Sequence, residues 1–123
     1  MQENSRDILN LVAQTIYEKK GLNILALDVS GISSITDTVI VAEGNVDRHV
    51  ITIAKSITQT LKEHGINPVF IEGVRHGDWV VLDYMQMIVH IFMPGYREKY
   101  QIERLFPSAE IIDLNLKAAA KVV

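Results

Sequence analysis

A helical segment set between short strand-like segments is the feature that most constrains the fold of this chain. Apolar residues recur at helical spacing over residues 46–61, the helix can begin at Asn45 or Asp47, and His64-Gly65 ends it. The same kind of reasoning predicts helices over 5–20 and 94–105, and strands over 24–29, 38–42, 69–72, 79–83 and 87–92.

These elements follow one another in the order αββαβββα, which predicts a mixed sheet with helices in one α/β or α+β layer structure. With 123 residues the chain has room for a single domain. We expect residues 6–113 to form its core and residues 114–123 to form a loosely held tail.

Charge and composition exclude several classes of function. Twelve Lys and Arg against fifteen Asp and Glu give a net charge of −3, so nucleic-acid binding would need a local basic patch, and the sequence does not suggest one. No apolar run approaches the ~20 residues that span a bilayer, and the polar amino terminus does not resemble a signal peptide. With no cysteine present, a cytoplasmic protein without a thiolate metal site is expected.

Patterns typical of catalysis are weak. Carboxylates that share a metal ion most simply stand two residues apart on one strand, and this spacing does not occur. Asp28, Asp37 and Glu43 lie around the first two strands and could hold Mg²⁺ only if the fold brought them together, as in a reduced nucleotidyltransferase-like enzyme. The four histidines are at least 12 residues apart, and no glycine-rich phosphate loop occurs. We therefore expect no cofactor and no metal, and keep the enzyme as the alternative.

The predicted hairpin over 78–92 is apolar on both faces, because Trp79, Val81 and Asp83 alternate with other large residues along its first strand. Either helices cover both faces or another protein covers one of them. Between residues 66 and 92 there are three acids and one arginine, which favours a basic partner. Aromatic residues beside a carboxylate are typical of a binding hot spot.

Five segments, in this order and spacing, resemble the ribosomal silencing factor family, also called iojap-like or DUF143. They are Ala26 to Asp37, Asp47-Arg48-His49-Val50, Glu72-Gly73, Asp78 to Tyr84, and Ile88 to Phe92. The resemblance covers about residues 6–113. It implies a fold related to nucleotidyltransferases but without their catalytic carboxylates.

The resemblance also implies a function without enzymatic chemistry. Members of this family bind protein fourteen of the large ribosomal subunit, hinder joining of the small subunit and repress translation when nutrients are limiting. The resemblance assigns partner binding to Trp79, Leu82, Asp83, Tyr84 and Met85. Many members have glycine at the position of Met85, so the conformation of this turn is left open. A homodimer through the apolar hairpin face is compatible with either function.

Overall fold

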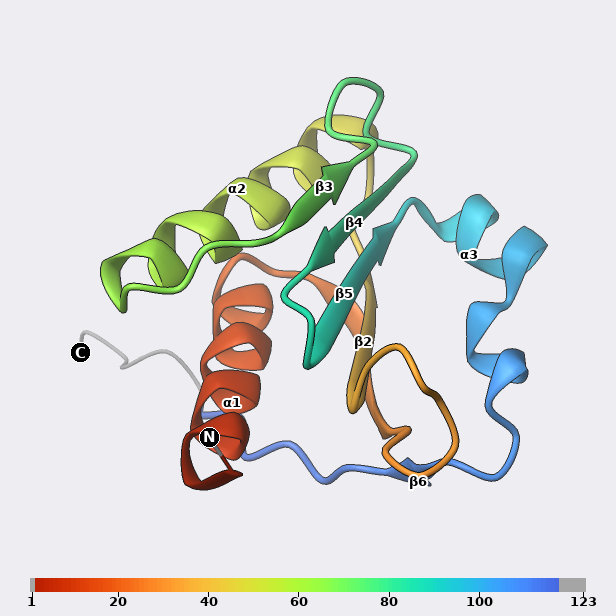
Figure 1. Cartoon of the computed structure of the whole chain (residues 1–123). Helices are drawn as coiled ribbons and strands as arrows, with labels where there is room; N and C mark the ends of the chain where they lie inside the picture. Colours follow the sequence, from red (N-terminus) through yellow and green to blue (C-terminus); the bar gives the residue numbers. More distant parts are fainter. Residues whose placement is uncertain (1, 118–123) are drawn as a thin grey trace.

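Figure 1 shows the computed structural model, which describes residues 2–117. Its elements are α1 (Gln2–Glu18), β1 (Leu22–Asp28), β2 (Thr38–Glu43), α2 (Asp47–Glu63), β3 (Phe70–Glu72), β4 (Trp79–Asp83), β5 (Met87–Phe92), α3 (Pro94–Tyr100), the 3₁₀ helix η1 (Ile102–Leu105) and β6 (Glu110–Ile111). The mixed α/β class and the order αββαβββα are confirmed, with one further strand, β6, at the end.

The six strands form one mixed sheet in the order β3-β4-β5-β2-β1-β6. Only β2 and β5 pair in parallel, and the other neighbours are antiparallel. A parallel pair needs a long crossover, which here contains α2, the edge strand β3 and the interior strand β4. Strand β3 is one edge of the sheet, and the two-residue strand β6 is the other.

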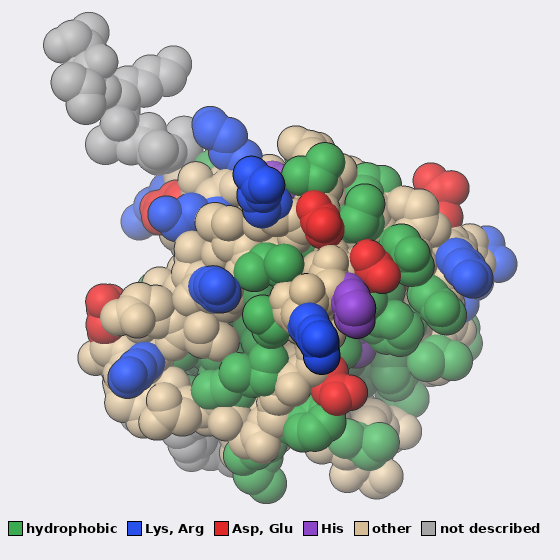
Figure 2. Space-filling model, turned by 90° about the horizontal axis from the view of Figure 1, so that it is seen from above, with side chains coloured by type: hydrophobic (Ala, Val, Ile, Leu, Met, Phe, Trp, Pro, Cys, Tyr) green, Lys and Arg blue, Asp and Glu red, His purple; other side chains and the backbone are tan. Residues whose placement is uncertain are grey.

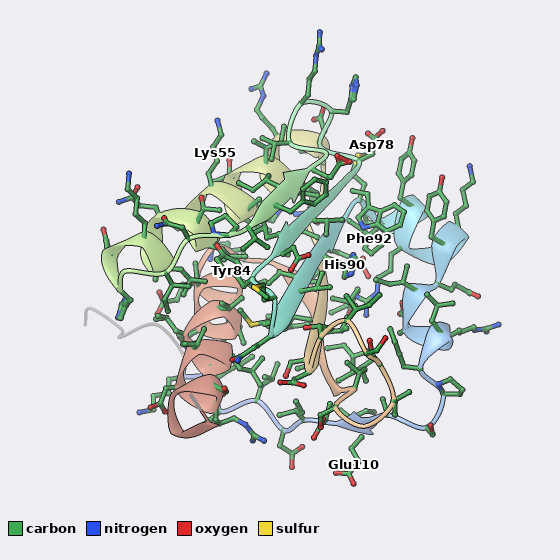
Figure 3. All side chains as sticks on the ribbon, in the orientation of Figure 1. Lys55, Asp78, Tyr84, His90, Phe92 and Glu110 are labelled. Atoms are coloured by element: carbon green, nitrogen blue, oxygen red, sulfur yellow. The ribbon has the colours of Figure 1, made fainter. Side chains whose placement is uncertain are left out.

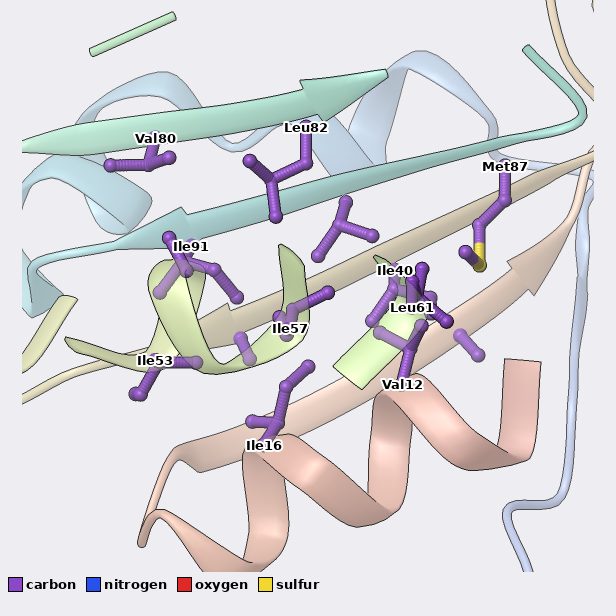
Figure 4. Packing of buried hydrophobic residues seen from close by; sticks show 14 of the residues in the cluster. Val12, Ile16, Ile40, Ile53, Ile57, Leu61, Val80, Leu82, Met87 and Ile91 are labelled. Atoms are coloured by element: carbon purple, nitrogen blue, oxygen red, sulfur yellow. The ribbon is translucent and has the colours of Figure 1, made fainter. Parts of the chain in front are cut away.

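Helices α1 and α2 pack on one side of the sheet and form the larger part of the core with it. The apolar stripe of α2 is buried along its whole length, as its spacing predicts. Figure 4 shows side chains from α1, α2 and the sheet meeting there: Val12, Ile16, Ile40, Ile53, Ile57, Leu61, Val80, Leu82, Met87 and Ile91.

The opposite side of the sheet is covered only in part, by the segment that contains α3 and η1 (Figure 1). Ile102 of η1 packs with Phe92 and with apolar side chains of β1 and β2 in a second buried cluster. Arg97 of α3 holds this segment down, because its guanidinium bonds Glu43 at 2.9 Å and Glu103 at 3.2 Å. Beyond this cover, the same side of β3 and β4 has no helix against it.

The helix predicted over 94–105 needs correction, and two further local features were not predicted. The helix expected over 94–105 is interrupted at Gln101, which adopts a left-handed conformation (φ 41°), so that α3 ends and η1 begins. Helix α2 starts without a side-chain cap from Asn45 or Asp47; instead the Asn45 N–H donates to Nδ1 of His49 at 2.9 Å. Strand β6 has only two residues, and no apolar run marks it.

The expected tail is held in place at its start. Leu114 packs against the helix-side core, and Gln14 of α1 makes two hydrogen bonds with the backbone of Lys117, at 2.7 and 2.9 Å. The rest of the predicted tail, 118–123, lies outside the described residues. Among residues 2–117, the structure contains no helix long and apolar enough to cross a bilayer.

Candidate partner-binding surface

The uncovered side of β3, β4 and β5 carries a continuous set of side chains, which we call the exposed sheet face. Residues opposite each other in an antiparallel ladder share a face, so the strand register defines its members. One member, Phe92, is buried; the others are Phe70, Glu72, Trp79, Val81, Asp83, Ile88 and His90. All of these others are half-buried or exposed, although β4 and β5 are interior strands. An apolar face with two carboxylates suits a basic protein partner.

Trp79 stands where this face meets the segment of α3. Its indole stacks on Phe92 with ring centroids 4.8 Å apart and meets Tyr100 of α3 at 4.9 Å. Its Nε1–H donates to Nδ1 of His90 at 3.0 Å. The polar end of the indole is thus satisfied inside the protein, while the ring remains partly exposed. Figure 3 labels His90 and Phe92, which lie two residues apart on the same face of β5.

His90 is neutral in this environment. Burial lowers its pKa to about 4, and the negative charge of Glu103 offsets only part of that effect. With Nδ1 accepting the bond from Trp79, the neutral ring carries its proton on Nε2. His90 therefore positions the indole, as a hydrogen-bonded sheet histidine.

The five residues expected to bind a partner divide between the two sides of the sheet. Trp79 and Asp83 lie on the exposed sheet face. Leu82 is wrongly placed in that set, because it points to the helix side and has no exposed surface. Alternation along a strand puts it opposite to its neighbours Val81 and Asp83. Leu82 acts as a core residue in this conformation.

Tyr84 and Met85 form the turn between β4 and β5. Met85 is 64% exposed and adopts a left-handed conformation (φ 71°), with its N–H bonded to the Asp83 carboxylate at 2.8 Å. This settles the open question of the turn: methionine takes the conformation that glycine adopts without strain. Tyr84 packs toward the helix-side core, where its buried hydroxyl has no hydrogen-bond partner among residues 2–117 and burial raises its pKa to about 12.

Sequence reasoning missed three further exposed or half-exposed members of this region. Phe70 of the edge strand is 53% exposed, Tyr100 is 47% exposed and packs against Trp79 with its ring tilted, and Ile88 lies beside Asp83 in the register. The periodicity of the strands could indicate which residues share a face within one strand. It could not show that α3 would bring Tyr100 over Trp79, because that contact depends on the tertiary fold.

The carboxylates of the alternative function do not converge. Asp28 and Asp37 line a cavity of about 370 Å³ between α1 and the ends of β1 and β2, whereas Glu43 lies at the other end of β2 and pairs with Arg97. Hydrogen bonds from Ser30 lower the pKa of Asp28. Within residues 2–117 there is no group of three acidic or histidine side chains able to hold a metal ion. Glu43 therefore does not share a site with Asp28 and Asp37, and only these two of the three carboxylates lie at one cavity.

A mixed sheet with one apolar, acidic face left open is typical of a protein-binding module. Comparison with known proteins identifies the family to which this chain is similar. A family model described as ribosomal silencing factor during starvation matches residues 2–122. The chain therefore belongs to the ribosomal silencing factor family, as the sequence resemblance implied.

Individual relatives agree with this assignment. The ribosomal silencing factor RsfS of Bacillus subtilis is 35% identical over 91% of this chain and 95% of its own length. A crystal structure of a Chromobacterium violaceum protein superposes with a TM-score of 0.80 at 34% identity, covering 92% of this chain and 93% of that one. A mouse protein named mitochondrial assembly of ribosomal large subunit protein 1 is 22% identical over 94% of this chain and 52% of its own length.

Proposed function

We propose that this protein silences translation in the cytoplasm by binding protein fourteen of the large ribosomal subunit through its exposed sheet face. The bound protein would block joining of the small subunit by occupying space, with no covalent step. Membership of the silencing factor family supports a ribosomal role. The name of the mouse relative, which refers to the large subunit, supports the choice of subunit.

The observation that carries the proposal is the uncovered apolar face itself. Phe70 and Met85 are more than half exposed, and Tyr100 and Trp79 continue the aromatic surface. An aromatic side chain can bury about 150–250 Å² in full, and a standard interface buries roughly 800 Å² on each partner. Partial burial of these side chains would supply a substantial part of such an interface.

The charge of this face supports a basic partner over a second copy of the chain. Glu72 and Asp83 are its charged side chains, because His90 on the same face is neutral. A homodimer built symmetrically on this face would bring both acids of each copy together, which disfavours it. We propose that any homodimer through this face is weak and competes with the ribosome, which sedimentation equilibrium would measure.

The test compares two neighbouring residues of β3. Phe70 lies on the exposed sheet face, whereas Ile71 pairs with Leu82 and lies on the other face of the same edge strand, 46% exposed. Phe70→Ala should weaken cosedimentation with isolated large subunits at least about fivefold, equivalent to about 1 kcal/mol. The matched control Ile71→Ala should bind normally, and neither variant should bind small subunits.

Equal losses in both variants, or normal binding by a folded Phe70→Ala, would show that the exposed sheet face is not the docking surface. Trp79→Ala should cost about 2 kcal/mol or more of binding. Its folding must be measured alongside, because Trp79 also bonds His90 and stacks on Phe92.

Addition of ATP and Mg²⁺ distinguishes the two functions. A protein that only binds a partner should keep its melting temperature, whereas an enzyme that binds the nucleotide should melt at a higher temperature. The proposed relation of the fold to nucleotidyltransferases stays a prediction from the sequence resemblance. The extent of the single domain, residues 1–123, also stays a prediction from the sequence.

A further inference from the structure

A row of three cations runs along the outer side of α2. Arg48, Lys55 and Lys62 are seven residues apart, and all three are exposed. Because seven residues make about two helical turns, these side chains lie nearly above one another over about 21 Å of helix. Figure 3 shows Lys55 pointing away from the sheet into solvent.

No acid lies between the three cations, and the exposed Asp47 and Glu63 stand directly before and after the row. The exposed residues between the three cations are Thr52 and Gln59, which are neutral. Both ion pairs found in residues 2–117 belong to Arg97, so the α2 cations have no carboxylate partner there. A solvent-exposed helix face in an acidic protein usually mixes both signs. Figure 2, which views the molecule from above, shows separate Lys and Arg side chains with Asp and Glu side chains among them.

Further cations stand near the first turn of α2. The loop 73–77 packs against it so closely that a Cβ on Gly77 would lie 2.7 Å from the backbone oxygen of Asp47, and this loop carries the exposed Arg75. The end of α1 is joined to the same turn, because His49 bonds the backbone oxygen of Lys19 at 2.7 Å. The fold thus assembles a basic surface that the sequence, read residue by residue, did not suggest.

We propose that this α2 row binds the phosphate backbone of ribosomal RNA on the side of the sheet opposite the docking face, and this inference rests on the proposed function. A nucleic-acid duplex carries about one charge per 1.7 Å of its axis, so phosphates are available opposite every cation of the row. Lysine and arginine on flexible stems with neutral polar neighbours suit phosphate contact without base readout. The row lies on α2 and not on the exposed sheet face, so RNA contact and protein docking use different side chains.

The test uses two double variants of equal charge. Lys55→Gln with Lys62→Gln removes most of the row, and Arg104→Gln with Lys117→Gln removes two exposed cations elsewhere. Each changes the net charge from −3 to −5, since two positive charges are lost. Binding to isolated large subunits is measured at several KCl concentrations from about 50 to 200 mM. Binding to a labelled RNA duplex of about 16 base pairs is measured by fluorescence anisotropy.

The α2 variant should bind large subunits about tenfold more weakly than the control at the lowest salt concentration. Its plot of log affinity against log salt should be less steep by about 1.5, because each lost phosphate contact removes about 0.7–0.9 from the slope. It should also bind the duplex more weakly than the control. Equal affinities and slopes for a folded α2 variant and its control would overturn the proposal.

Two other outcomes separate the proposals. A loss on large subunits without a loss on the duplex would show that α2 meets an acidic protein, and the RNA assignment would be wrong. If the unmodified protein does not bind large subunits, the proposed function fails, and the duplex comparison alone decides whether α2 binds RNA.

Discussion

The indole N–H of Trp79 donates a hydrogen bond of 3.0 Å to Nδ1 of His90 across the β4–β5 ladder. This bond requires an unprotonated Nδ1, which agrees with the low pKa of His90, about 4. The hydrogen bond fixes the orientation of the Trp79 indole, which lies where the exposed sheet face meets Tyr100 of α3. The orientation of the proposed docking surface therefore depends on a histidine that stays neutral.

Acidification should destabilise the protein through His90. Its pKa is about 4 in the folded chain and about 6.5 when unfolded, so below pH 6.5 the unfolded state binds a proton that the folded state does not. The loss begins near pH 6.5, is complete near pH 4, and amounts to about 3 kcal/mol. Urea unfolding of the unmodified protein and of His90→Gln, at pH 7 and 4.5, isolates this contribution from that of the carboxylates. A difference between the two proteins that does not change with pH would contradict the prediction.

Leu82→Ala should lower the free energy of unfolding by about 2–5 kcal/mol, because Leu82 is fully buried between the sheet and the helices. Denaturant unfolding measures the loss. The variant that remains folded at low temperature should bind large subunits normally. Weakened binding by that folded fraction would return Leu82 to the partner-binding set.

Substitution of Met85 should separate stability from binding. Met85→Gly should stabilise the protein by about 1 kcal/mol, because glycine adopts a φ of 71° without steric cost. It should also weaken partner binding, since an exposed apolar side chain is lost from the edge of the docking surface. The control Met85→Ala should weaken binding equally without stabilising the fold. Thermal unfolding and subunit cosedimentation distinguish these outcomes, and a destabilised Met85→Gly would refute the argument from the turn.

Arg97→Met should destabilise the protein by about 3 kcal/mol, because Glu43 would keep a buried charge without its partner. Replacing both Arg97 and Glu43 by Met should recover part of this loss, since the more buried carboxylate is removed and only the less buried Glu103 is left without Arg97. Arg104→Met, on the exposed side of η1, serves as the control and should have little effect. Urea unfolding of the four proteins measures these differences. A double variant less stable than Arg97→Met would contradict this account of the pair.

The sequence predicted the strands well where local patterning decides them. The bounds of β4 and β5 agree with the prediction, and those of β1, β2, β3 and α2 agree within two residues. Alternation and helical spacing are local properties, so they survive in the folded chain. The break at Gln101 was missed because Arg97 draws α3 toward Glu43, a residue 54 positions earlier.

The sequence by itself determined the order of helices and strands, the apolar stripe of α2 and the membership of the silencing factor family. Only the tertiary structure decided that Leu82 is buried while Phe70 is exposed, that Glu43 lies far from Asp28, and that Tyr100 meets Trp79. The periodicity of a strand separates its two faces but does not say which face another layer covers. That choice depends on how distant segments pack, and here α1 and α2 cover one side of the sheet while α3 leaves part of the other open.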